Sequence, residues 1–170
     1  IIGNSLHYDE EDGCFKVWYD TAGGVAYATS QDGYRWDKPS LGIIESGGTR
    51  NNNLISPGRN FSLVKDAREG DTSKRYKAMY WHSRGDPEMP WGGKGHFVAY
   101  SRDGIRWEPD PRNPVADFKN GLTDGQFVLG WDDNHGKYIA YMRPIVGFFD
   151  PERRTSAWVA SDDFVNWGPP

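Results

Sequence analysis

The stretch SQDGYRW at residues 30–36 decides the fold, because it returns twice along the chain. The second copy is SRDGIRW at residues 101–107, and the third is SDDFVNW at residues 161–167, with Phe164 at the position of the glycine. An Asp-Gly step supplies the positive φ of a tight hairpin turn, and serine and aspartate side chains can bond to the turn backbone. A tryptophan on the returning strand can then cover the turn. The motif is therefore predicted to be a structural hairpin rather than a catalytic one.

Each copy ends a series of strand-like segments that occurs three times in the same order. The segments alternate in period two and are rich in aromatic residues. They are expected at residues 4–8, 61–65 and 126–131 for the innermost strands, at 15–19, 75–81 and 137–143 for the second strands, and at 25–29, 96–100 and 157–160 for the third strands. Four antiparallel strands per repeat form the blade of a β-propeller. A β-sandwich is the alternative, but it does not explain why the same strand order recurs.

The predicted fold is therefore an all-β, partial β-propeller with approximate blades at residues 1–45, 46–115 and 116–170. The 8 Trp, 9 Tyr and 8 Phe support an ordered chain, because disordered chains are poor in aromatic residues. The net charge of -4 and the absence of a basic cluster argue against a nucleic-acid partner. No apolar run approaches the ~20 residues of a membrane span. Cys14 is the only cysteine, which excludes an intrachain disulfide and a cysteine-based zinc site.

Several segments together carry a resemblance to a known group. They are the repeated hairpin, the asparagines at 51–53, Lys65-Asp66 followed by the strand at 75–77, and the strand that starts at 136–138. The chain resembles bacterial proteins of the five-bladed propeller superfamily that holds glycoside hydrolase families 32, 43 and 68, above all its poorly characterised family-32-like members. The resemblance implies five blades around an axis, an acidic pocket at one end of the channel, and an extracellular or periplasmic location.

The chain holds about three of those five blades, begins without a methionine or a signal-like segment, and stops directly after a repeat. An open arc of blades leaves strand edges unpaired and core faces bare. We therefore expect a piece of a longer protein, whose propeller is completed by another copy or by further chain.

Two aspartates are the candidate catalytic residues. Glycoside hydrolysis normally uses two carboxyl groups that flank the scissile bond, and in the resembling hydrolases these come from the innermost strands of successive blades. Asp66 ends the innermost strand of the second repeat, and Asp124 precedes that of the third. The alternative for each is a turn aspartate, because Asp is common in turns. Asp124 also stands where the resembling enzymes usually have glutamate, and their Asn-Asp-Pro motif of the first blade is missing.

Arg143, His82, His96, Trp91 and Asn52 are the candidate substrate-binding residues. The planar guanidinium of Arg143 can hold a sugar carboxylate or sulfate. Tryptophan faces stack on sugar rings, while histidine and asparagine bind hydroxyl groups. The alternatives are a surface salt bridge for Arg143, packing for the histidines and Trp91, and a loop turn for Asn52.

These features predict a carbohydrate-active protein, either a glycoside hydrolase or part of one. A sialidase-like hydrolase and a propeller that binds carbohydrate or protein without catalysis are the alternatives. No cofactor is expected: some of the resembling proteins hold a calcium ion on the axis, but no residue spacing here indicates a calcium loop. Carboxyl groups of Asp66 and Asp124 within ~5 to 10 Å of each other favour hydrolysis, whereas positions on opposite faces favour binding.

Overall fold

The computed structural model describes residues 3–56, 58–82, 95–115, 123–144 and 156–168. These residues form β-strands and one 3-10 helix, η1 (Thr72–Lys74), so the all-β prediction is confirmed. The strands are β1 Gly3–Asp9, β2 Cys14–Thr21, β3 Gly24–Ser30, β4 Leu54–Ser56, β5 Arg59–Lys65, β6 Tyr76–His82, β7 Gly95–Ser101, β8 Glu108–Pro109, β9 Thr123–Asp132, β10 Lys137–Pro144 and β11 Ala157–Ser161. No helix within these ranges is long and apolar enough to cross a membrane.

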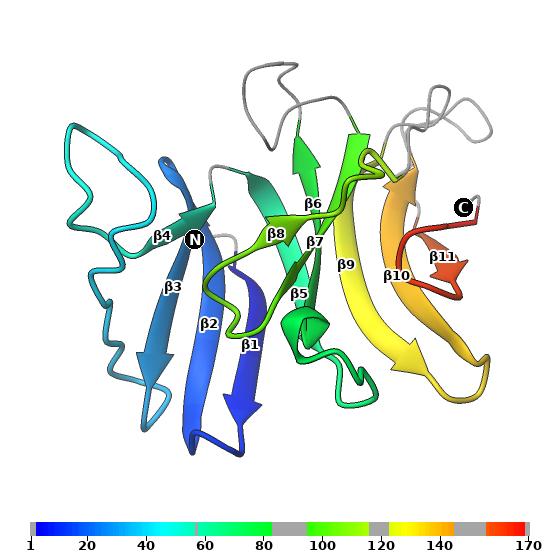
Figure 1. Cartoon of the computed structure of the whole chain (residues 1–170), viewed down its shortest axis with the longest axis horizontal. Coiled ribbons are helices and arrows are strands. Elements are labelled where there is room, and N and C mark those ends of the chain that lie inside the picture. Colours follow the sequence, from blue (N-terminus) through cyan, green and yellow to red (C-terminus); the bar gives the residue numbers. More distant parts are fainter. Residues whose placement is uncertain (1–2, 57, 83–94, 116–122, 145–155, 169–170) are drawn as a thin grey trace.

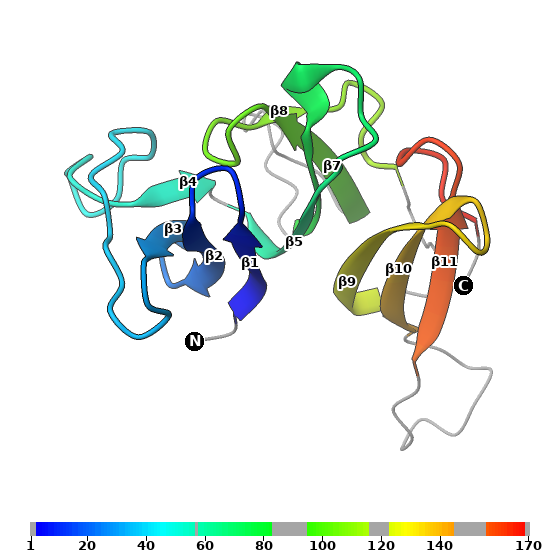
Figure 2. The same ribbon diagram turned by 90° about the horizontal axis from the view of Figure 1, so that it is seen from below.

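The strands form three antiparallel sheets that follow one another along the chain (Figure 1). The first sheet has the order β1-β2-β3-β4, the second β5-β6-β7-β8 and the third β9-β10-β11. Seen from below in Figure 2, the sheets form an arc, with β1, β5 and β9 on its concave side. These are successive blades of a partial β-propeller, as predicted, with β1, β5 and β9 as the innermost strands.

The repeated motif closes a hairpin in each sheet. In the second copy, the Oγ of Ser101 accepts a hydrogen bond from the backbone N of Gly104 at 2.9 Å, and Asp103 accepts from the next two backbone N atoms at 2.8 Å. The indole of Trp107 donates to the carbonyl of Gly104 at 3.0 Å. The aspartates of the other two copies accept equivalent bonds. The motif is therefore a self-contained turn, as its sequence indicates.

The first sheet extends further along the chain than residue 45. Its fourth strand, β4, pairs with β3 through Ala26 opposite Leu54 and Val25 opposite Ser56. The segment after Trp36 contributes only an isolated bridge, between Thr29 and Asp37. The long loop thus returns to the edge of its own sheet before the second sheet begins at Arg59.

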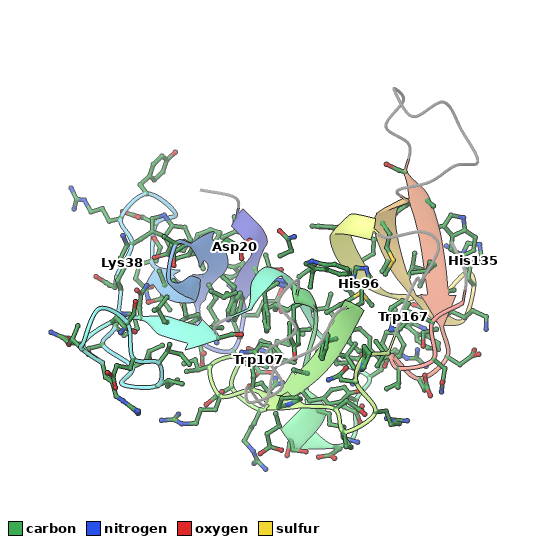
Figure 3. The ribbon with its side chains drawn as sticks, turned by 90° about the horizontal axis from the view of Figure 1, so that it is seen from above. Asp20, Lys38, His96, Trp107, His135 and Trp167 are labelled. Atoms are coloured by element: carbon green, nitrogen blue, oxygen red, sulfur yellow. The ribbon has the colours of Figure 1, made fainter. Side chains whose placement is uncertain are left out.

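The buried apolar side chains form two clusters, each between neighbouring sheets. The first cluster includes Trp18, Tyr80 and Trp107, and the second includes Met79 and Phe164. Trp107 lies near the border of the first two sheets in Figure 3. The first sheet therefore buries an apolar face against the second, and the second buries one against the third, as in other repeat architectures.

Candidate functional site

The three innermost strands give the arc two distinct ends. They lie side by side, because Leu63 N donates to Ser5 Oγ and Val128 N donates to Ser62 Oγ, both at 2.9 Å. All three run in the same direction (Figure 1). They share a strand-start end, where they begin, and a turn end, where a hairpin joins each of them to the next strand.

Four of the predicted site residues lie at the strand-start end. Asp124 is the second residue of β9, and Arg143 is near the end of β10, where Pro144 pairs with Thr123. In the second sheet, His82 ends β6 and His96 is the second residue of β7. The side chains of Asp124, Arg143 and His82 lie outside the described residues, as does the whole of Trp91. The backbone register nevertheless places these four residues at one end of the arc.

His96 is fully buried, and its ring centroid lies 5.1 Å from that of Trp81. Burial lowers the pKa of His96 to about 4, so the imidazole is neutral at neutral pH. A neutral imidazole can donate one hydrogen bond and accept another, but it attracts no anion. The packing alternative therefore describes His96 better than direct sugar contact does.

Asp20, near the end of β2, is a carboxylate at the strand-start end that the sequence does not single out. Its Oδ2 accepts a hydrogen bond from the backbone N of Asn60 at 3.0 Å, and Asn60 has a φ of 52°. Its Oδ1 is buried without a hydrogen-bond partner within the described ranges. Figure 3 shows Asp20 on the first sheet and His96 on the second, seen from this end. Asp20 therefore links the start of β5 to the first sheet.

Asp66 lies at the turn end, directly after β5, and its carboxylate is buried. It accepts hydrogen bonds from the hydroxyl of Tyr138 at 2.5 Å and from the backbone N of Arg68 at 3.0 Å, and Lys77 Nζ lies 3.4 Å away. Burial alone would raise the pKa of Asp66, but these partners outweigh it and hold the pKa below its usual value. This arrangement corresponds to the turn-capping alternative.

The structure does not bring Asp66 and Asp124 together. In the third sheet, the residue equivalent to Asp66 is Asp132, which is the last residue of β9. Asp124 lies eight residues before Asp132 in β9, which corresponds to roughly 26 Å along a strand. That separation exceeds the ~10 Å that two cooperating carboxyl groups allow. The two aspartates therefore lie at opposite ends of the arc.

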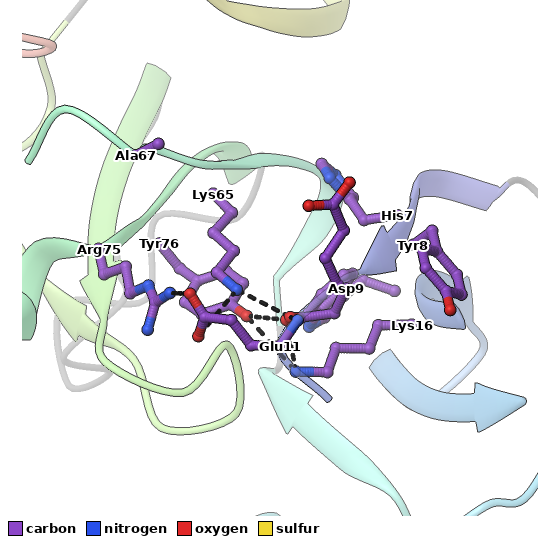
Figure 4. Close-up of a pocket in the computed structure, with 11 residues that line it drawn as sticks. His7, Tyr8, Asp9, Glu11, Lys16, Lys65, Ala67, Arg75 and Tyr76 are labelled. Carbon is purple, nitrogen blue, oxygen red and sulfur yellow. Dashed lines mark hydrogen bonds and ion pairs between the residues drawn. The ribbon is translucent and has the colours of Figure 1, made fainter. Parts of the chain in front are cut away.

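A cavity of about 330 Å³ opens at the turn end between the first two sheets, lined in part by Asp9, Lys65 and Arg75. Asp9 is buried and accepts hydrogen bonds from Lys16 at 2.8 Å, Lys65 at 2.8 Å and the hydroxyl of Tyr76 at 2.9 Å (Figure 4). Burial would raise the pKa of Asp9, but these three donors keep it far below its usual range. The acids and bases here compensate one another, so the cluster is a structural link between sheets.

The sequence interpretation missed this cluster, although a signal for it exists. Asp9 and Asp132 end their innermost strands and Asp66 directly follows its own, and each accepts a hydrogen bond from the backbone N two residues later. A comparison of the repeats from the innermost strand, rather than from the tryptophan hairpin, shows this recurrence. An aspartate that recurs in every blade indicates a role in the repeat itself.

Asn52 lies in the loop before β4, at the outer edge of the first sheet. Its Nδ2 donates to the carbonyl of Ile44 at 2.9 Å, and its Oδ1 accepts from the backbone N of Leu54 at 3.0 Å. These bonds hold the loop, which is the alternative role for Asn52. Within the described ranges, no group of three or more His, Cys, Asp or Glu could hold a metal ion.

Known structures share the architecture of the chain. A fructofuranosidase from Schwanniomyces occidentalis matches it with a TM-score of 0.63 and 19% identity, over 98% of this chain and 32% of that protein. An exo-inulinase from Aspergillus awamori gives a TM-score of 0.59 at 20% identity, over 98% and 36%. A family 32 β-fructofuranosidase from Bombyx mori gives 0.58 at 15%, over 98% and 33%.

No protein-family model matches the chain, and no curated protein does so either. The chain spans about a third of the length of the solved structures that it matches. At these identities the similarity concerns the fold, which agrees with the predicted resemblance. The chain therefore has part of the β-propeller fold that these three structures share.

Proposed function

We propose that the chain is part of a glycoside hydrolase whose site lies at the strand-start end of the innermost strands. One observation carries the proposal: the strand register puts Asp124, Arg143 and His82 at that end. A carboxylate serves as acid, base or nucleophile in glycoside hydrolysis, and a guanidinium binds an anionic substituent or orients a second carboxylate. The similarity in fold to fructofuranosidases and an inulinase supports this chemical class.

Asp124 is the carboxylate that we assign to the reaction. Its partner comes from another strand at the same end, because two cooperating carboxyl groups must flank one bond. Asp66 is too far from that end and is committed to Tyr138 and Lys77. Asp66 therefore acts on the stability of the protein rather than on the substrate.

A glycan panel on the full-length protein tests this assignment, and it includes β-fructosides because the matched structures are fructofuranosidases and an inulinase. We expect Asp124→Asn to abolish turnover and to leave the urea midpoint of unfolding unchanged. Asp66→Asn should lower that midpoint. The matched control is Asp162→Asn, whose side chain is 79% exposed and which should change neither quantity. Full turnover in Asp124→Asn would remove Asp124 from the mechanism.

A propeller that binds carbohydrate without cleaving it is the second candidate. The observation in its favour is that Asp66 and Asp124 lie at opposite ends, so the predicted pair does not form one catalytic site. In that case a glycan binds to the wild type with measurable heat in calorimetry, and no product forms. Binding that survives Asp124→Asn and is lost in Arg143→Ala would favour this function over hydrolysis.

A further inference from the structure

The third sheet exposes an aromatic face on the side that points away from the second sheet. Phe127, Tyr141 and Trp158 lie opposite one another on β9, β10 and β11. These residues are 53%, 46% and 51% exposed, although the side chain of each is large and mainly apolar. Contiguous exposed aromatic residues commonly mark a contact surface.

The same three positions are buried in the other two sheets. The equivalent residues, in the order innermost, second and third strand, are Ser62, Met79 and Val98 in the second sheet and Ser5, Trp18 and Tyr27 in the first. None of these six is more than 9% exposed. They are buried because they face the next sheet: Ser5 bonds to Leu63, and Ser62 bonds to Val128. The aromatic face of the third sheet thus corresponds to the surface with which the first sheet contacts the second and the second sheet contacts the third.

A polar contact marks the same surface at its turn end. Asp9 accepts a hydrogen bond from Tyr76 and Asp66 accepts one from Tyr138, and each tyrosine belongs to the second strand of the following sheet. Asp132 is the next aspartate in this series. Its carboxylate pairs with His135 and accepts a hydrogen bond from the backbone N of Asn134, and both of these residues belong to its own turn.

We propose that the aromatic face binds a further blade of the same polypeptide, and that this blade presents a tyrosine hydroxyl to Asp132. The contact continues an interface that the chain already forms twice. A second copy of this chain fits less well, because its first sheet carries Phe15 where Tyr76 and Tyr138 stand, and phenylalanine has no hydroxyl to donate. The inference concerns assembly and is independent of the proposed activity.

Oxidative footprinting of the full-length protein tests the contact. Trp18, which is 0% exposed, and Tyr34, which is 90% exposed, are the internal references for buried and free side chains. We expect Trp158 and Tyr141 to be labelled as slowly as Trp18, at every protein concentration. Labelling at the rate of Tyr34 would overturn the proposal. Protection that disappears on dilution would also overturn it, in favour of a second copy, and protection that needs added polysaccharide would do so in favour of a glycan platform.

Asp132→Asn in the full-length protein tests the tyrosine bond separately. We expect this variant to lower the urea midpoint by about as much as Asp66→Asn does and to increase the labelling of Trp158. Asp162→Asn, on the same sheet but 79% exposed, is the control and should change neither. An unchanged urea midpoint in Asp132→Asn would overturn the proposed hydrogen bond to Asp132. Whether a further blade covers the aromatic face is tested separately, by the footprinting of the wild type.

Discussion

Two contacts join the three sheets: the first contact lies between the first and second sheets, and the second contact lies between the second and third sheets. The two contacts fill the equivalent space in opposite ways. In the first contact, Trp18 projects from β2 and its indole donates to the carbonyl of Gly104 at 2.6 Å. In the second contact, the strand position of Trp18 holds the smaller Met79, and the turn position of Gly104 holds Phe164, which is fully buried. A large side chain thus comes from the strand in one contact and from the turn in the other.

This difference explains why the third copy of the motif lacks glycine. A Cβ atom on Gly104 would lie 2.8 Å from Cζ2 of Trp18, so only glycine fits beside the tryptophan. Phe164 has a φ of 67°, which is strained for a bulky residue, yet it packs against Tyr138 with ring centroids 5.2 Å apart. Burial of the ring offsets the backbone strain. The degenerate motif is therefore a packing solution rather than a decayed turn.

The two contacts also differ in charge. Asp9 bonds to two lysines and a tyrosine, whereas Asp66 bonds to one tyrosine and lies 3.4 Å from one lysine. A buried carboxylate with more donors compensates more positive charge, so its removal leaves more charge unpaired. The first contact should therefore depend more on its aspartate than the second contact does.

Removal of these carboxylates should have the largest effect. We expect Asp9→Ala to lower the free energy of unfolding by about 4 kcal/mol and Asp66→Ala by about 3 kcal/mol, because each leaves buried partners unpaired. Urea unfolding followed by circular dichroism measures both values. Asp12→Ala is the control, since Asp12 is 60% exposed and also pairs with Lys16; it should cost under about 1 kcal/mol. A larger loss in Asp66→Ala than in Asp9→Ala would contradict the comparison.

Substitutions that give the first contact the residue types of the second test whether the side chains at positions 18 and 104 occupy the same space. Gly104→Phe should destabilise the protein by about 3 kcal/mol, through the clash with Trp18 and a φ of 74°. In the double variant Trp18→Met/Gly104→Phe, part of that loss should be recovered, with a coupling energy of about 1 to 2 kcal/mol. Unfolding of the two single variants and the double variant gives the coupling energy.

Gly33→Phe is the matched control for the exchange. Gly33 has a similar φ of 76°, but a Cβ atom there would approach nothing closer than 3.7 Å. This variant should show only the backbone strain of about 1 to 2 kcal/mol. Additive losses from Trp18→Met and Gly104→Phe would show that the two positions do not share one space.

Acidification should weaken the first contact through Asp9. In the unfolded chain the pKa of an aspartate is about 3.9, and in the folded protein the pKa of Asp9 lies below this value. The ionised Asp9 therefore stabilises the folded protein above about pH 4, and this stabilisation is lost as the pH falls. The unfolding free energy should therefore decrease below about pH 4, and Asp9→Asn should flatten that decrease. Urea titrations at a series of pH values measure the slope. An identical slope in wild type and Asp9→Asn would exclude Asp9 as the titrating group.

The sequence is sufficient for the hairpins and the blades, because their chemistry is local. Ser101, Asp103 and Gly104 bond within one turn, so residues close together in sequence are enough to indicate it. The role of Asp66 is not local: its tyrosine partner lies 72 residues further along the chain. A turn aspartate and a pocket aspartate have the same neighbours in sequence, so only the packing of sheets separates them. For the candidate site, the sequence predicts only which residues lie at the ends of strands. Asp124 and Arg143 are two such residues that lie at the same end.

Removal of single hydroxyl groups should give the smallest effect and the sharpest test of how the two contacts differ. We expect Tyr138→Phe to cost about 2 kcal/mol, because it deletes the 2.5 Å hydrogen bond to the carboxylate of Asp66, which has fewer other donors. Tyr76→Phe should cost about 1 kcal/mol, since Asp9 keeps both lysines. Tyr34→Phe, on a side chain that is 90% exposed, should leave the urea midpoint unchanged. Equal losses at Tyr76 and Tyr138 would mean that the lysines of Asp9 do not compensate for the missing hydroxyl, and that the two contacts rely on their tyrosines alike.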